Sequence, residues 1–143
     1  MKLVGEVGEY IDLEAKGLYK PGRTITDEMR IDELGDIWYY LRIIAYICEI
    51  TIEDCLDTWD WDEFHYGDPE DALFHLACSA ANLLVAWKEY GVEEEFLISV
   101  VCEFNSYITM RGFTLDQITD ANYSKLVSID GKGIHGWKTV YED

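Results

Sequence analysis

The chain has 143 residues, enough for one domain, and 49% of them are hydrophobic, so it can bury a substantial core. It carries 29 acidic residues against 11 basic ones, which gives a formal net charge of −18. This charge argues against a nucleic-acid partner, because neutralising phosphates requires a basic face, and against a membrane surface for the same reason. The longest uncharged run, residues 72–87, is short and contains polar side chains, so no bilayer span is expected.

The four cysteines form no CxxC pair, and each lies in a hydrophobic stretch. In such a setting cysteine acts more often as a small hydrophobic residue than as a disulfide partner or a metal ligand. We therefore expect a reducing compartment and a cytoplasmic protein. The cysteines are Cys48, Cys55, Cys78 and Cys102.

Hydrophobic residues recur with helical periodicity throughout, and the two prolines, Pro21 and Pro69, lie where this pattern stops. Thr51 and Thr114 are expected to cap helix N-termini, and Thr114 with Gln117 has the form of a capping box. The pattern predicts an all-α helical bundle. Its helices are expected at residues 2–17, 26–48, 52–62, 70–90, 93–110 and 115–127, and a glycine-rich tail follows.

The six predicted helices form two sets of three, each long, long and short. Residues 49–54 align with 112–117, and 14–17 resemble 87–91, which suggests a degenerate internal duplication of a three-helix unit. A bundle without a repeat is the alternative. With the duplication, the single domain 1–143 consists of a metal-binding half (1–65), a second half that has lost the acids (66–130) and a C-terminal tail (131–143).

Two pairs of acids with i, i+3 spacing occur on consecutive predicted helices. Glu6 and Glu9 belong to the first helix, and Glu33 and Asp36 belong to the second. Residues at this spacing are neighbours on a helix surface, and a turn at residues 20–23 lets the second helix return along the first, so the four carboxylates would face one space. Such a cluster, buried without a partner, would be strongly unfavourable or become protonated, so the space requires a cation.

Ligand type indicates which cation is expected. All-oxygen ligands suit Mg²⁺, with Mn²⁺ as the alternative, and neither Glu6 nor Glu33 is followed by the i+3 histidine of carboxylate di-iron bundles. Mg²⁺ commonly shares its shell with substrate phosphates, so the pattern predicts phosphate chemistry. The alternative is that the acids are the wet edges of amphipathic helices. The nearby Gly5, Gly8 and Gly35 favour a site, because glycine costs about 0.5–1 kcal/mol in a helix and suggests a close approach to the backbone.

The segments LVGEVGEYIDLEAKG and IDELGDIWYYL resemble the MazG-like all-α NTP pyrophosphohydrolases, whose signature is ExxE, a variable linker and ExxD. The 23 residues between Glu9 and Glu33 fit this layout. The resemblance implies that Glu6, Glu9, Glu33 and Asp36 hold Mg²⁺. It also implies that water attacks the α-phosphorus of a nucleoside triphosphate, which yields a monophosphate and pyrophosphate, and that the chain forms a homo-oligomer, a dimer or a tetramer.

The resemblance returns at ITDANYSKL, residues 118–126, which is similar to a later AN-x-x-KL element of the family. It assigns Asn122 and Lys125 to phosphate or nucleotide contacts. The chain departs from the family pattern after the second acidic helix, where Trp59 and Asp62 stand at the positions that the duplication aligns with this pair. With the duplication, the acids survive in one half and the Asn/Lys pair in the other. One site would then be completed across both halves, and we expect Lys125 near the acids.

Other residues receive roles in this interpretation. Glu9 or Glu33 takes the proton of the attacking water, and the sequence does not decide between them. Lys16 and Lys20, near the first interhelical loop, are expected to contact phosphates. Tyr39 lies close enough to the acids to stack on a base.

The sequence thus predicts a Mg²⁺-dependent nucleoside triphosphate pyrophosphohydrolase that removes unwanted nucleotides from the pool. Purine or pyrimidine dNTPs, damaged nucleotides and alarmones all stay open as substrates. One rival shares this chemistry, a phosphoribosyl-ATP pyrophosphohydrolase. A rival of another class is a non-catalytic acidic binding protein that mimics DNA. The DNA mimic predicts acids spread over the surface and a functional Glu33→Gln variant, whereas the enzyme predicts near-complete loss in that variant.

Overall fold

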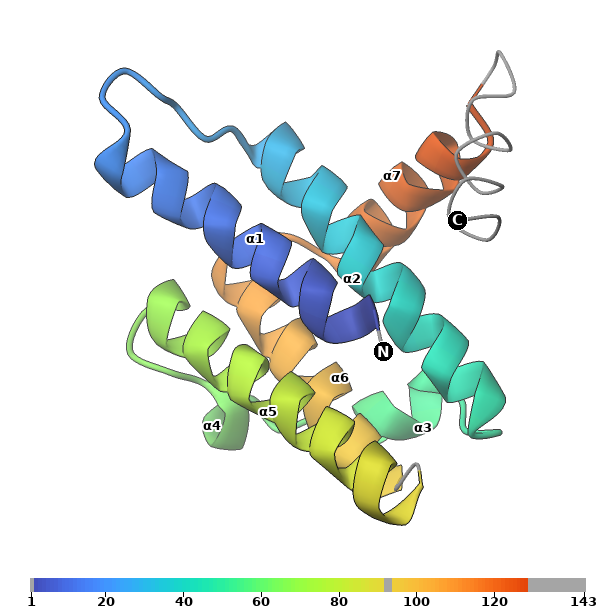
Figure 1. The fold of residues 1–143 in the computed structure, drawn as a ribbon. Coiled ribbons are helices and arrows are strands. Elements are labelled where there is room, and N and C mark those ends of the chain that lie inside the picture. Colours follow the sequence, from blue (N-terminus) through green and yellow to red (C-terminus); the bar gives the residue numbers. More distant parts are fainter. Residues whose placement is uncertain (1, 92–93, 129–143) are drawn as a thin grey trace.

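The computed structural model describes residues 2–91 and 94–128, and these residues form helices and no strands. The all-α prediction is therefore confirmed for the described part of the chain. In Figure 1, α1 and α2 form one antiparallel pair, and α5 and α6 form another. The helices are α1 (Lys2–Tyr19), α2 (Asp27–Ile47), α3 (Ile52–Asp57), α4 (Trp61–Phe64), α5 (Pro69–Tyr90), α6 (Glu94–Met110) and α7 (Leu115–Leu126).

The helix boundaries agree with the predicted ones to within two residues, except for the helix predicted at 52–62. This helix ends at Asp57, and a separate short helix, α4, begins after Asp60. Asp60 adopts an extended conformation, and its side chain accepts a hydrogen bond from the backbone N–H of Asp62 at 2.9 Å. Aspartate commonly competes for backbone donors in this way, which is why it caps helices rather than continuing them.

The predicted caps at Thr51 and Thr114 are confirmed. The Thr51 side chain accepts a hydrogen bond from the N–H of Asp54 at 3.0 Å. Thr114 and Gln117 form a reciprocal capping box, with side-chain to backbone distances of 3.1 and 2.9 Å. These contacts satisfy N–H groups that the first helical turn leaves without partners.

Each of the short helices α3 and α7 packs against a long helix of the other predicted half. α3 packs against α6, and α7 packs against α2. The turns that precede them have the same local structure: Glu49 and Gly112 have positive φ values of 58° and 84°. After each turn the next N–H donates back five residues, from Ile50 to Ala45 at 3.1 Å and from Phe113 to Ile108 at 2.8 Å. This arrangement places α7 against the acidic helix α2. The internal duplication itself stays a prediction.

The core lies between the two long helix pairs. Trp38 of α2 is 3% exposed and stacks on Phe104 of α6 with ring centroids 5.4 Å apart. Its indole N–H donates to the hydroxyl of Thr119 on α7 at 2.9 Å. Trp38 therefore joins three helices and belongs to the core, and it positions the acids that precede it on α2.

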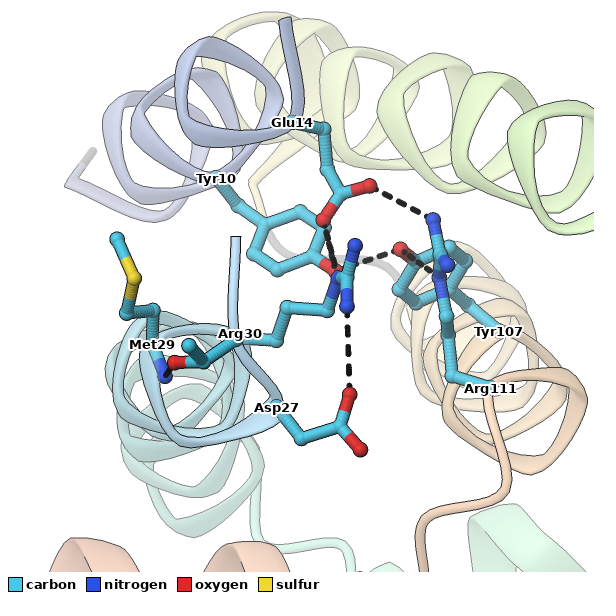
Figure 2. A network of polar contacts seen from close by, with 8 residues as sticks. Tyr10, Glu14, Asp27, Met29, Arg30, Tyr107 and Arg111 are labelled. Atoms are coloured by element: carbon cyan, nitrogen blue, oxygen red, sulfur yellow. Dashed lines mark hydrogen bonds and ion pairs between the residues drawn. The ribbon is translucent and has the colours of Figure 1, made fainter. Parts of the chain in front are cut away.

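A polar network holds α1 against α2 and α6 (Figure 2). Glu14 of α1 accepts hydrogen bonds from Arg30 of α2 at 2.6 Å and from Arg111, just after α6, at 2.7 Å. The hydroxyls of Tyr10 and Tyr107 lie 2.6 Å apart, and Arg111 Nε donates to Tyr107 Oη at 3.0 Å. Charge-assisted contacts of this kind fix geometry as well as adding energy. The network therefore sets the register of the two acidic helices.

None of the described helices is long and apolar enough to cross a membrane. The four cysteines are free; Cys55 and Cys102 are buried, as expected for small hydrophobic residues, whereas Cys78 is exposed. The predicted tail, 131–143, lies outside the described residues.

Candidate metal centre

The antiparallel packing of α1 and α2 brings three of the four predicted metal ligands together. One carboxylate oxygen from each of Glu6, Glu9 and Glu33 can be chosen so that all three lie within 4.8 Å of one another. The i, i+3 spacing places the first two side by side on α1, and the third faces them from α2. Convergence of carboxylates from two helices is the arrangement that the spacing of the acids predicts.

Asp36, the fourth predicted ligand, is paired with a cation of the protein. Its Oδ1 lies 2.9 Å from the Nζ of Lys125, which also lies 3.2 Å from Asp32 Oδ1. The structure thus brings Lys125 of α7 to the acids of α2, where we expected it. Asp32, four residues before Asp36, belongs to neither of the two acidic pairs that the i, i+3 spacing singles out.

The carboxylates of this centre are deficient in partners. Glu6 and Glu33 each keep one buried Oε2 atom that has no hydrogen-bond partner. Burial, with the nearby Asp36 and Glu9 carboxylates, raises the pKa of Glu6 to about 7. Burial, again with Asp36, raises the pKa of Glu33, and burial raises the pKa of Asp36 despite its contact with Lys125. A buried oxygen without a partner is costly, so the centre favours a cation or bound protons.

A cleft of about 640 Å³ opens beside this centre, and Glu9 and Glu33 lie in its wall. This volume falls within the range of small-molecule sites. Two basic residues also line the cleft: Lys16, which pairs with Asp12 at 2.9 Å, and Arg23, from the loop between α1 and α2. The cleft therefore places carboxylates and cations around one space, as an anionic ligand bound through a metal ion requires.

The three glycines near the acids have different environments. A Cβ atom added to Gly35 would lie 3.2 Å from the Cβ of Asn122, so this glycine allows α7 to pack closely on α2. Gly5 and Gly8 line the cleft, and an added Cβ would meet nothing within 4 Å at either position. At Gly35, helix α7 approaches the backbone closely. Gly5 and Gly8 instead border the open space of the cleft.

Four residues predicted to contact substrate do not line the cleft: Lys125, which pairs with Asp36, and the three described next. Asn122 is 3% exposed, and its Oδ1 accepts a hydrogen bond from Arg42 at 3.2 Å, so its observed contacts are structural. Lys20 is exposed after the end of α1, and Arg23 of the same loop lines the cleft instead. Tyr39 makes an edge contact with Tyr40, with ring centroids 5.3 Å apart. The sequence places Lys20 and Arg23 in one loop, and only the course of the loop decides which reaches the cleft.

Neither a protein-family model, nor a curated protein, nor a solved structure matches this chain. The resemblance to MazG-like enzymes therefore rests on the two acidic motifs and the ITDANYSKL segment, and a functional assignment has to be argued from the geometry of the centre and its cleft.

Proposed function

We propose that the chain is a Mg²⁺-dependent pyrophosphohydrolase of the MazG-like type, which cleaves nucleoside triphosphates between the α and β phosphates. The observation that carries this proposal is the pair of buried carboxylate oxygens without partners, on Glu6 and Glu33, within a cluster of three carboxylates. Such a cluster beside a cleft that contains Lys16 and Arg23 suits a metal-bound polyphosphate.

The donor set fits a hard divalent cation. Glu6, Glu9 and Glu33 would hold Mg²⁺ or Mn²⁺, and Asp36 lies beside them. When bound, the cation supplies positive charge for the phosphates and acidifies a water molecule.

The chain's own residues supply the remaining roles. Glu9 and Glu33 both line the cleft, so either side chain is placed to accept the proton of the attacking water. Lys16 and Arg23 bind the phosphates that leave as pyrophosphate, and Lys125 contributes a further positive charge.

The burial of the acids favours an enzyme over a DNA mimic. A mimic presents its carboxylates to a basic partner, so they should lie on the surface. Glu6 and Glu33 are instead partly buried, and each has an oxygen that solvent does not reach. Phosphoribosyl-ATP stays in the proposal as an alternative substrate, since it would require the same metal centre.

The decisive experiment is product analysis with purified protein, MgCl₂ and a panel of canonical and modified NTPs and dNTPs together with phosphoribosyl-ATP. We expect monophosphate and pyrophosphate, with loss of activity in EDTA. Glu33→Gln should reduce the rate by at least about 100-fold, because removal of a ligand or base commonly costs this much. Glu28→Gln, an exposed acid on the same helix, is the matched control and should retain activity. Formation of diphosphate and phosphate, no turnover of any substrate, or an active Glu33→Gln variant would overturn the proposal.

We also propose that the chain forms homo-oligomers through the outer faces of α1 and α5. Four residues at helical spacing on α5 are exposed and uncharged: Phe74, Cys78, Ala81 and Val85. Ile11 and Leu18 of α1, which packs against α5, are 39% and 81% exposed. In a chain with a net charge of −18, an uncharged apolar face is where two copies can meet without strong repulsion.

A further inference from the structure

An apolar pocket of about 250 Å³ lies where the start of α1 meets α2 and the C-terminal part of α5. Its walls are aliphatic and aromatic, with one lysine and no acid, which is unusual in so acidic a chain. The lining residues are Lys2, Leu3, Tyr40, Ile44, Leu84 and Trp87.

Two residues of this pocket are helical neighbours of acids at the candidate metal centre. Leu3 precedes Glu6 by three residues on α1, and Tyr40 follows Asp36 by four on α2, so each pair consists of helical neighbours. Burial, together with the nearby Glu6 carboxylate, raises the pKa of Tyr40.

The basic residues of the cleft lie on the opposite side of the centre. With a rise of about 1.5 Å per residue, Lys16 lies roughly 10 Å beyond Glu9 along α1, and Leu3 lies roughly 5 Å before Glu6. Arg23 lines the same cleft as Lys16. Along α1, the apolar pocket, the carboxylates and the two basic residues of the cleft therefore follow one another, and Leu84 and Trp87 of α5 complete the pocket at its end of α1.

We propose that the apolar pocket holds the nucleobase of the substrate, stacked on Trp87 and Tyr40, while the phosphates extend across the carboxylates towards Lys16 and Arg23. This inference rests on the proposed function and assigns an orientation to the substrate. The pocket is smaller than sites for whole drug-sized ligands, about 300–1,000 Å³, and suits one ring system. Aromatic walls stack on any base, so the pocket selects for a base and discriminates weakly among bases.

The test compares Trp87→Ala with the unaltered chain in equilibrium binding of three probes in MgCl₂: non-hydrolysable α,β-imido analogues of dATP and dUTP, and inorganic tripolyphosphate, which has no base. We expect both nucleotides to bind about 10- to 100-fold more weakly to Trp87→Ala, because stacking of one base contributes this much. Tripolyphosphate affinity should stay unchanged, and Trp87→Phe should restore most of the nucleotide affinity. Trp61→Ala is the matched control, since Trp61 and Trp87 are 37% and 39% exposed.

Thermal unfolding of each variant checks that the fold is kept. Equal weakening of nucleotides and tripolyphosphate, or no weakening at all in Trp87→Ala, would overturn the base pocket. If pyrophosphate is released from nucleotides while Trp87→Ala binds them normally, the proposed function stands and only the pocket assignment fails. If nucleotides bind through Trp87 but no pyrophosphate is released by the unaltered chain, the pocket stands and the proposed function fails.

Discussion

The Nζ atom of Lys125 lies 2.9 Å from Oδ1 of Asp36 and joins the last turn of α7 to the acidic face of α2. Burial opposes the charge of Lys125, but the carboxylates of Asp36 and Asp32 outweigh it and raise the pKa of the ammonium group. The ammonium group therefore stays charged at neutral pH. This pair connects the second predicted half of the chain to the candidate metal centre in the first.

Replacing this ammonium group should separate its effects on metal and on substrate. In Lys125→Met, we expect the KM for the triphosphate to rise about 10-fold, because a charge-assisted hydrogen bond contributes about 1.5–3 kcal/mol. Affinity for Mn²⁺ should increase, since a competing cation has left the acids. Steady-state kinetics and calorimetric titration measure the two effects. Lys88→Met, on exposed α5 surface, serves as control, and an equal change in both variants would contradict the role of Lys125.

The raised pKa values predict how stability depends on pH in the absence of metal. The pKa of Glu6 is about 7 in the folded chain and near 4.5 when unfolded, so the folded state binds its proton more tightly between these values. The free energy of unfolding should therefore fall as pH rises from about 4.5 to about 7. Glu33 and Asp36, whose pKa values are also raised, act in the same direction.

Thermal unfolding from about pH 5 to about pH 8, in EDTA and in MgCl₂, measures this dependence. Glu6→Gln should show a shallower decline than the unaltered chain in EDTA. Mg²⁺ should stabilise the unaltered chain more at the upper end of the range, because it displaces protons from its ligands. Parallel stability curves for Glu6→Gln and the unaltered chain, or equal stabilisation by Mg²⁺ at the lowest and the highest pH, would contradict the assignment of this pH dependence to the buried carboxyl groups.

Glu14 should contribute strongly to stability, because it holds two arginines and its side chain is only 16% exposed. Glu14→Gln leaves Arg30 and Arg111 without their shared carboxylate, and we expect a loss of about 3 kcal/mol, as is typical when one partner of a buried pair is removed. Asp27→Asn removes a 72% exposed carboxylate from the same Arg30 and should cost less than about 1 kcal/mol. Urea unfolding measures both, and similar losses in the two variants would show that burial is not the deciding factor.

The environments of the glycines predict opposite effects of alanine at two positions. Gly35→Ala should destabilise the chain by about 1 kcal/mol, because the new Cβ would press against Asn122 in a tight contact between helices. Gly5→Ala meets no atom and should stabilise α1 by about 0.5–1 kcal/mol. Chemical unfolding of the two variants provides the comparison. If Gly35→Ala stabilised the chain, α7 would be able to move away from α2 at little cost, which would contradict this prediction.

The outer face of α5 predicts the oligomeric state. Phe74→Glu places a charge in the middle of the apolar face and should convert an oligomer to a monomer, because each copy already carries a large negative charge. Light scattering coupled to gel filtration measures the mass. Tyr123→Glu, at a 65% exposed aromatic residue of α7, is the control and should leave the assembly intact. A monomeric unaltered chain would contradict the proposal directly.

Much of the local structure is determined by the sequence alone. Helix periodicity, the caps at Thr51 and Thr114 and the break at Pro69 depend on interactions within about four residues, so they can be predicted without the fold. The approach of three carboxylates also followed from local spacing, since two helices joined by a short loop pack side by side. The break after Asp57 was missed because aspartate caps are common but not obligatory.

Only the tertiary structure decided which other residues reach the centre. Lys125 and Asn122 belong to one short motif, yet the first contacts Asp36 while the second is buried against Gly35, because their directions depend on how α7 packs on α2. In the same way, Trp87 of α5 reaches a pocket beside α1 through contacts between segments more than 80 residues apart. Such contacts depend on the packing of whole helices, which no local pattern in the sequence specifies.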